Sequence, residues 1–286
     1  MINFVKSAID KVIDNKRTYV LDDVHFTRDR KWPFSVFINF MIFRIKTTIR
    51  HSINHMYKLL NEFDFKKISP SDFSQQRIFI DPEAFKVINR EFLKNIGITD
   101  KKRSMKTFKG KRVFAGDGSD LEIFNLLSTR FDFKVKSKTK KYTYPAIAKF
   151  SAVMDVLNGY LIDGTLGNFK EGDLPMIHKN LENLHDVIDF PNSIFTFDRG
   201  YVGLELDARL LELGTNFVIR LRKGVYKEEI NNMKSDDEII KLKLTDERLA
   251  KFHDPELKAK YEKIGYIKLR IVKTKVKVIR FDKKNR

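Results

Sequence analysis

The sequence lacks cysteine and contains little tryptophan or proline. Its 286 residues include no cysteine, one tryptophan and 7 prolines. Without cysteine, neither a disulfide framework nor a thiolate zinc site can form, and the composition fits a reducing compartment. We therefore expect a cytoplasmic protein.

Long apolar runs are also missing. The longest, Pro33–Phe43, is interrupted by Ser35 and Asn39, and it is far shorter than the roughly 20 residues of a membrane-spanning helix. We predict a buried helix there. Asp10 and Asp14 interrupt the first apolar segment, unlike the apolar core of a signal peptide. We expect neither export nor a membrane partner.

Acidic residues are fewer than basic residues in this sequence. The 38 Asp and Glu stand against 56 Lys and Arg, which gives a formal net charge of +18. Such an excess favours a polyanion held through its phosphates, with nucleic acid as the first candidate. Ribosome-associated proteins, membrane-surface proteins and lysine-biased genomes produce the same balance. The 42% hydrophobic content, with 25 Phe, indicates a globular chain.

Residues 1–108 are predicted to form a helical domain, because apolar side chains recur there at helical spacing. A Ser-Pro pair at 69–70 and an Asp-Pro pair at 81–82 supply caps and first-turn prolines. They precede two further predicted helices, Phe73–Phe79 and Ala84–Ile96. Short capped helices joined by tight turns are compatible with a DNA-binding domain.

A helix-turn-helix relative would use its exposed polar side chains to contact a DNA groove. Gln75, Gln76 and Arg77 are the candidates for such contacts. An ordinary helical bundle explains the same pattern equally well, so both interpretations stay open.

A basic segment, Lys101–Arg112, joins the helical domain to the first strand. We place a domain boundary between residues 108 and 109 and expect phosphate contacts from Lys109, Lys111 and Arg112. The alternative is a solvated loop. The lysines that alternate between residues 134 and 141 leave the same two interpretations open.

From residue 109 the periodicity changes to that of strands and short helices. An Asn-Gly pair at 158–159 indicates a hairpin, so the strands on either side of it should be antiparallel. The predicted elements are, in order, strands at Val113–Gly116, Ala146–Val156 and Tyr160–Leu166, a helix at Glu171–Asp186, a strand at Ser193–Phe197, a helix at Val202–Leu213 and a strand at Asn216–Leu221.

Three leading strands followed by strands alternating with helices predict an α/β (α+β) fold with a mixed five-stranded sheet and flanking helices. The order resembles the ribonuclease H-like fold. We assign residues 109–222 to this core and residues 223–286 to a partial β-rich insertion. The insertion ends in an alternating run that begins at Tyr266.

Two acidic residues follow strands of the predicted core, Asp117 after the first and Asp198 after the fourth. Ligands bind at strand ends in open sheets, and carboxylates are the hard oxygen ligands of Mg²⁺ or Mn²⁺. If the two strands are neighbours, both side chains can reach one point. Because an Asp beside a Gly is also common in turns, turn formation is the alternative for each acid taken alone.

Two longer motifs contain these acids, GDGSDLEIF at 116–124 and FTFDRGYVGLELDARLLELGTNFVIRLR at 195–222. Both motifs, in this register, resemble those around the first two acids of DDE transposases of the insertion-sequence-four type. The resemblance covers roughly residues 25–222. It implies that Asp117 and Asp198 are catalytic and bind two divalent ions, Mg²⁺ or Mn²⁺.

The resemblance further implies cut-and-paste transposition, in which double-stranded DNA of the element ends is cleaved and joined to target DNA. Arg199, Tyr201, Arg220 and Arg222 lie in the second motif and are further candidates for DNA contacts. Each of them could instead have a structural role. By analogy with the synapsis of two ends, we expect a homodimer on DNA, and association with the nucleoid when DNA is bound.

One part of the family pattern is missing. The third acid of the family is a Glu within a motif of Tyr, two residues, Arg, three residues, Glu, six residues and Lys. None of the tyrosines after Asp198 has Arg three positions on; they are Tyr201, Tyr226, Tyr261 and Tyr266. We therefore expect a chain truncated within its insertion, which is weakly active or inactive alone.

Two alternatives to an active transposase remain. The chain could be a truncated, non-catalytic DNA-binding remnant that inhibits its intact parent. It could also be a different ribonuclease H-like nuclease, which the Asp-Arg-Gly-Tyr motif disfavours.

Overall fold

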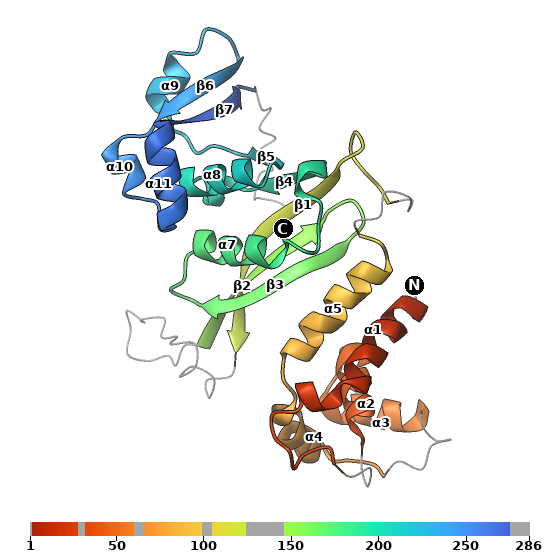
Figure 1. Ribbon diagram of the computed structural model, residues 1–286. Coiled ribbons are helices and arrows are strands. Elements are labelled where there is room, and N and C mark those ends of the chain that lie inside the picture. Colours follow the sequence, from red (N-terminus) through yellow and green to blue (C-terminus); the bar gives the residue numbers. More distant parts are fainter. Residues whose placement is uncertain (1, 28–31, 60–65, 99–104, 124–145, 275–286) are drawn as a thin grey trace, which may run out of the picture. The chain divides into compact units, whose positions relative to one another are not determined.

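The computed structural model describes residues 2–27, 32–59, 66–98, 105–123 and 146–274 (Figure 1). The lysines at 134–141 and the first residues of the basic segment, 101–104, lie outside the described residues. The chain divides into two compact units, residues 1–104 with 186–188 and residues 105–185 with 189–286. The predicted boundaries at 108 and 222 stay predictions.

The first unit is helical, as predicted. Its α4 starts with a capping box, in which the Ser69 side chain accepts from the Asp72 N–H and the Asp72 side chain accepts from the Ser69 N–H. The helices are α1 (Ile2–Asp14), α2 (Phe34–Phe43), α3 (Ile49–Leu59), α4 (Pro70–Gln76) and α5 (Glu83–Asn95), with short 3-10 turns η1 (Lys16–Tyr19) and η2 (Arg77–Phe79).

Aromatic rings form the centre of this unit. Phe73 stacks on Phe37 with ring centroids 5.5 Å apart and meets Phe40 edge-on at 4.9 Å. Trp32 packs against Phe40 from the other side. The apolar run at 33–43 is therefore a buried helix, and no described helix has the length and apolar character to cross a membrane.

The second unit contains a five-stranded sheet in the order β3-β2-β1-β4-β5. β1 pairs antiparallel with β2, and β2 with β3, whereas β4 runs parallel to both β1 and β5. This topology confirms the predicted ribonuclease H-like sheet. The strands are β1 (Arg112–Ile123), β2 (Ala146–Asp155), β3 (Tyr160–Asn168), β4 (Ser193–Phe197) and β5 (Asn216–Ile219).

The predicted hairpin joins β2 to β3. Gly159 has a φ of +73°, which glycine adopts without the steric cost of a Cβ. The Asp155 carboxylate organises the turn by accepting from the N–H groups of Leu157 and Asn158. The Asn-Gly pair therefore belongs to a turn of four residues, 156–159.

Helix α7 (Asp173–Asn183) packs on one face of the sheet, against β1, β2 and β3 (Figure 1). A buried polar network fixes its position, because the Asn180 amide donates to the Asp163 carboxylate at 2.7 Å and contacts the Ser151 hydroxyl. The helix starts two residues later than predicted, after Gly172, and Glu171 precedes it.

The other face of the sheet carries apolar side chains that remain exposed. By strand alternation they point away from α7, and Leu166 and Val218 keep 54% and 63% of their surface accessible. Met154 and Leu161, which pair across β2 and β3, belong to the same face and are also exposed.

β1 is longer than predicted. The strand was expected to end at Gly116, but it continues to Ile123 because β2 pairs with it over that whole length. Asp117 therefore lies inside a strand, although the parallel partner β4 ends opposite Gly116. The glycine serves close packing rather than a turn: a Cβ there would lie 2.5 Å from Phe197 and 2.7 Å from Ile177.

Beyond β5 the chain forms a two-stranded antiparallel sheet with three short helices. Strand β7 starts at Tyr266, as predicted, but the intervening segment is more helical than the alternating run alone indicates. After β5 come α9 (Lys227–Asn231), β6 (Asp237–Lys243), α10 (Asp246–Leu249), α11 (Pro255–Ile264) and β7 (Tyr266–Val272). Before β5, helix α8 (Leu204–Glu212) links β4 to β5.

α8 connects this segment to the five-stranded sheet. Its Ala208 is buried among Phe252, Leu257 and Tyr261. On the same helix, the buried Asp207 accepts a hydrogen bond from the Tyr226 hydroxyl at 3.2 Å. Burial raises the pKa of Asp207 to about 7, and the Tyr226 hydrogen bond offsets only part of that rise.

Substituting Gly116→Ala should lower the free energy of unfolding by about 1–3 kcal/mol, because the added methyl overfills the contact with Phe197 and Ile177. Urea denaturation measures this loss. Gly172→Ala is the control, since its Cβ would be 3.4 Å from the nearest side chain, Pro175, and should cost less than about 1 kcal/mol. Equal losses for the two variants would contradict the packing role.

Asp207→Asn should remove a pH-dependent loss of stability. Because the pKa of Asp207 is raised in the folded state, the folded chain binds more protons than the unfolded chain between about pH 4 and pH 7. Wild-type stability should fall over that range, by at most on the order of 4 kcal/mol, and stay low above it. The variant should match wild type near pH 4 and exceed it near pH 8 in urea denaturation. Parallel pH profiles would refute this assignment.

Candidate active site

Two acidic residues on neighbouring strands lie at the level where β4 ends. In the parallel register Gly116 lies opposite Phe197, so Asp117 and Asp198 are the next residues on two neighbouring strands. Adjacent strands are about 4.8 Å apart, which brings the two backbones close enough for one shared ligand. Of the two acids only Asp198 lies at a strand end, because β1 continues past Asp117.

Both carboxylates are exposed, and neither forms an ion pair within the described part of the chain. Asp117 accepts from the N–H of Gly118 at 2.8 Å. Asp198 accepts from the N–H of Gly200 and thereby caps the short turn η5 (Arg199–Tyr201). Each acid therefore keeps one carboxylate oxygen without a protein hydrogen bond among the described residues.

Tyr201 lies beneath this pair and is only 2% exposed. Its ring packs against Phe197 with centroids 5.4 Å apart, and its buried hydroxyl has no hydrogen-bond partner among the described residues. Burial raises the pKa of Tyr201, and the negative charges of Asp173, Asp117 and Asp198 raise it further. The expectation that Tyr201 contacts DNA is wrong, because its side chain is enclosed by the core.

Asp173, the first residue of α7, is the acid that the sequence did not reveal. A Cβ on Gly118 would lie 2.6 Å from its Oδ1 and 3.4 Å from the Tyr201 oxygen, so both groups occupy the space above that glycine. In the sequence Asp173 resembles any helix-initiating acid. The only hint of its position was the glycine directly after Asp117.

Lys149 of β2 neutralises this acid. Its ammonium lies 3.0 Å from Asp173 and 3.6 Å from Asp120. Burial lowers the pKa of Lys149, but the hydrogen bond and charge of Asp173, together with Asp120, outweigh burial and raise it. Asp173 is thus paired, unlike Asp117 and Asp198. No three acids or histidines of the described residues are grouped as a complete metal site.

A family model described as a transposase DDE domain matches residues 108–282, more than half of the chain. This chain belongs to the DDE transposase family. The DDE transposase family predicted from the two motifs is thereby confirmed, whereas the insertion-sequence-four type stays a prediction. The match extends through β7.

Two solved structures are similar to this transposase at 12% sequence identity. A crystal structure of a pre-cleavage Mos1 transpososome matches 63% of this chain and 62% of its own, with a TM-score of 0.28. A cryo-EM structure of a piggyBac transposase synaptic complex with hairpin DNA matches 83% of this chain and 45% of its own, with a TM-score of 0.33. The chain spans less than two thirds of either. None of the curated proteins compared with it matches.

The three basic residues around 109–112 that are predicted to contact DNA differ from one another in their surroundings. Arg112 forms an ion pair with Asp155, which is 0% exposed, so its guanidinium supports the hairpin. The expected phosphate contact of Arg112 stays a prediction, because the ion pair shows a structural role without testing DNA contact. Lys111 donates to the Pro191 carbonyl at 2.7 Å, whereas Lys109 lies exposed in a tight turn.

Arginines of the second motif lie beside Asp198. Arg222 donates through Nε to the carbonyl of Arg199 at 2.8 Å, which joins the end of β5 to the η5 turn. Arg199, Arg220 and Arg222 are all exposed. The structure thus brings Arg199 and Arg222 together next to one acid.

The remaining DNA-contact candidates lie in the helical unit, near the end of α4. Gln75 and Arg77 are exposed and Gln76 is half-buried. Arg77 lies over the ring of Phe73 at 5.9 Å. Their contact with DNA stays a prediction.

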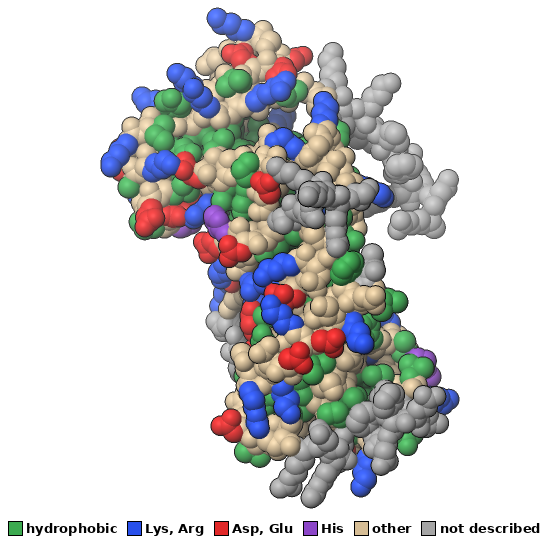
Figure 2. Space-filling view, turned by 45° about the vertical axis from the view of Figure 1, so that its right-hand side comes forward, with side chains coloured by type: hydrophobic (Ala, Val, Ile, Leu, Met, Phe, Trp, Pro, Cys, Tyr) green, Lys and Arg blue, Asp and Glu red, His purple; other side chains and the backbone are tan. Residues whose placement is uncertain are grey.

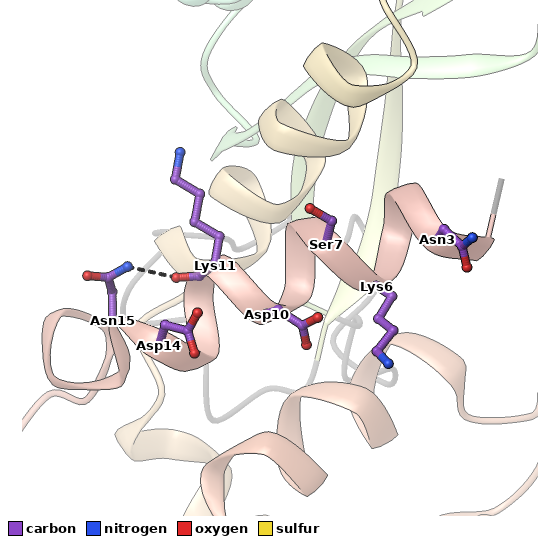
Figure 3. A pocket seen from close by; sticks show the side chains of 7 residues that line it. All are labelled: Asn3, Lys6, Ser7, Asp10, Lys11, Asp14 and Asn15. Carbon is purple, nitrogen blue, oxygen red and sulfur yellow. Dashed lines mark hydrogen bonds between the residues drawn. The ribbon is translucent and has the colours of Figure 1, made fainter.

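A groove along α1 includes none of the acids of the candidate site among its lining residues. The groove has a volume of about 410 Å³ and is lined by seven polar residues (Figure 3). They include two lysines, Lys6 and Lys11, and two acids, Asp10 and Asp14. On the face shown in Figure 2, Lys and Arg side chains are interspersed with Asp and Glu.

Arg112→Met should cost about 3–5 kcal/mol in the free energy of unfolding, because it leaves the Asp155 carboxylate buried without its cation. Chemical denaturation measures the loss. Lys109→Met, an exposed neighbour, should stay within about 0.5 kcal/mol of wild type. A loss below about 1 kcal/mol for the Arg112 variant would show that the ion pair is not structural.

Proposed function

We propose that this member of the DDE family is a cut-and-paste transposase of the insertion-sequence-four type, in which Asp117 and Asp198 are catalytic. One observation supports this most directly: β1 and β4 pair with each other as far as Gly116 and Phe197, and the two exposed acids are the residues that come next. Both lie within the part of the chain that matches the DDE domain.

The donor groups suit Mg²⁺ or Mn²⁺, which we propose as the cofactor. Both acids offer carboxylate oxygens, the preferred ligands of these hard cations, and each keeps one oxygen without a hydrogen bond from the described residues. Two such ions, when bound, stabilise the attacking and leaving oxygens of an in-line phosphodiester displacement. The role of the chain is to hold its two carboxylates at one level of the sheet.

We further propose that the site needs a third carboxylate that these 286 residues do not supply. The family's Tyr-Arg-Glu-Lys motif is missing from the sequence, and the described residues hold no third acid placed as a ligand. The apolar face opposite α7, with Leu166 and Val218 exposed, offers a surface for the helix that would carry it. By itself the chain should be weakly active or inactive.

Double-stranded DNA, as element ends and target, is the proposed partner. Arg199 and Arg222, beside Asp198, and the exposed Arg220 are suited to contact phosphates near the scissile bond. Lys109, and separately the residues at the end of α4, are proposed as further DNA contacts. We propose a homodimer on DNA, acting in the cytoplasm and associated with the nucleoid when DNA is bound.

The alternative proposal is a non-catalytic DNA-binding product that inhibits its intact parent. The same missing third acid supports it. Both proposals expect the chain alone to bind DNA without cleavage, so the distinguishing result is inhibition of the intact parent's DNA cleavage when the 286-residue chain is added.

Asp117→Asn and Asp198→Asn should each weaken Mn²⁺ binding by the 286-residue chain at least tenfold, because each removes an anionic ligand. Electron paramagnetic resonance of free Mn²⁺ measures the affinity. Asp120→Asn is the matched control, since this acid lies on the same strand but faces Lys149, and should change the affinity less than twofold. Unchanged binding in both site variants would refute the metal site.

The same variants test the division between DNA binding and cleavage. We expect the wild-type chain to bind DNA without Mg²⁺-dependent nicking, and Asp198→Asn to bind DNA with undiminished affinity. Rapid nicking by the wild-type chain would overturn the proposal that a third carboxylate is missing.

A further inference from the structure

Tyr201 presents a polar group that the core does not satisfy. The side chain is 2% exposed, and its hydroxyl has no hydrogen-bond partner among the described residues. A buried donor without an acceptor destabilises a fold, and phenylalanine would fill the same space without that cost. The hydroxyl therefore calls for an explanation outside packing.

The surroundings of the hydroxyl are acidic. Asp173 is its strongest charged neighbour, followed by Asp117 and Asp198. Over Gly118, the positions of the Tyr201 oxygen and the Asp173 carboxylate converge, since a Cβ on that glycine would lie within 3.4 Å of both. Because nearby negative charge and burial both favour the protonated form, the group is held as a hydrogen-bond donor.

The position of Tyr201 in the chain connects this donor to the proposed metal ligands. The residue ends η5, the turn that Asp198 caps, and its ring packs on Phe197 directly before that acid. Gly118, beneath the hydroxyl, directly follows Asp117. A hydrogen-bonded connection from the hydroxyl to Asp173 would hold the η5 turn against the start of α7, over Gly118 of β1, and so restrain the separation of the two acids.

We propose that Tyr201 is a positioning residue, whose hydroxyl donates to the Asp173 carboxylate through one bridging water and thereby sets the spacing of Asp117 and Asp198 for divalent metal. Lys149 completes the arrangement by holding Asp173 in place from β2. The side chain of Tyr201 contacts neither DNA nor metal. This inference rests on the proposed metal site.

The first test is Tyr201→Phe, which keeps the ring and removes only the hydroxyl. We expect the Mn²⁺ dissociation constant of the 286-residue chain to rise about tenfold, in the range seen when groups that orient metal ligands are lost. The melting temperature without metal should change little, because phenylalanine keeps the packing of the ring against Phe197. Tyr266→Phe, in β7, is the matched control and should change neither quantity.

The outcomes separate this inference from the proposed function. If Asp117→Asn abolishes Mn²⁺ binding but Tyr201→Phe leaves it unchanged at a temperature where both chains are folded, the positioning role is refuted and the metal site stands. If neither variant changes Mn²⁺ binding, the proposed metal site itself fails. A lower melting temperature with unchanged Mn²⁺ affinity would assign Tyr201 a purely structural role and also overturn the inference.

Asp173→Asn provides an independent measurement. An amide can still accept from the bridging water but attracts Lys149 less strongly, so Mn²⁺ affinity should fall less than in the tyrosine variant. A larger loss than for Tyr201→Phe would show that Asp173 acts on the metal through its own charge, against the proposed chain of contacts.

Discussion

The parallel pairing of β1 with β4 is the constraint on which the candidate site depends. Gly116 faces Phe197 with no room for a side chain, and this close contact fixes the register that puts Asp117 and Asp198 at one level. Antiparallel pairing with β2 then extends β1 beyond the end of β4. One acid is therefore rigid within a strand, while the other caps a turn whose position depends on packing.

Charge pairing sorts the acids of this unit into two groups. Asp155 and Asp173 are paired with Arg112 and Lys149, so each of these two charges already has a partner within the chain. Asp117 and Asp198 have backbone donors and form no ion pair among the described residues. In a chain with a net charge of +18, two neighbouring acids without an ion pair are the groups on which the proposed metal site rests.

The periodicity of the sequence predicted the sheet well, because alternation and the Asn-Gly pair are local signals. β4 has the predicted bounds, and the hairpin between β2 and β3 forms. The length of β1 could not be predicted: Gly116 and Gly118 resemble turn residues, yet they are needed because Phe197 and Asp173 approach the backbone. That reason exists only in the folded chain.

The roles of individual side chains were harder to predict for the same reason. Arg112 ends a basic segment and Tyr201 lies in a motif next to Asp198, so both seemed suited to DNA, but Arg112 pairs with Asp155 of β2 and Tyr201 is buried. These surroundings change what each can do: the guanidinium balances a buried carboxylate, and the hydroxyl has no partner among the described residues. Because a carboxylate site is only as precise as the groups that orient it, the enclosed tyrosine matters to the metal geometry as much as an exposed residue would to DNA.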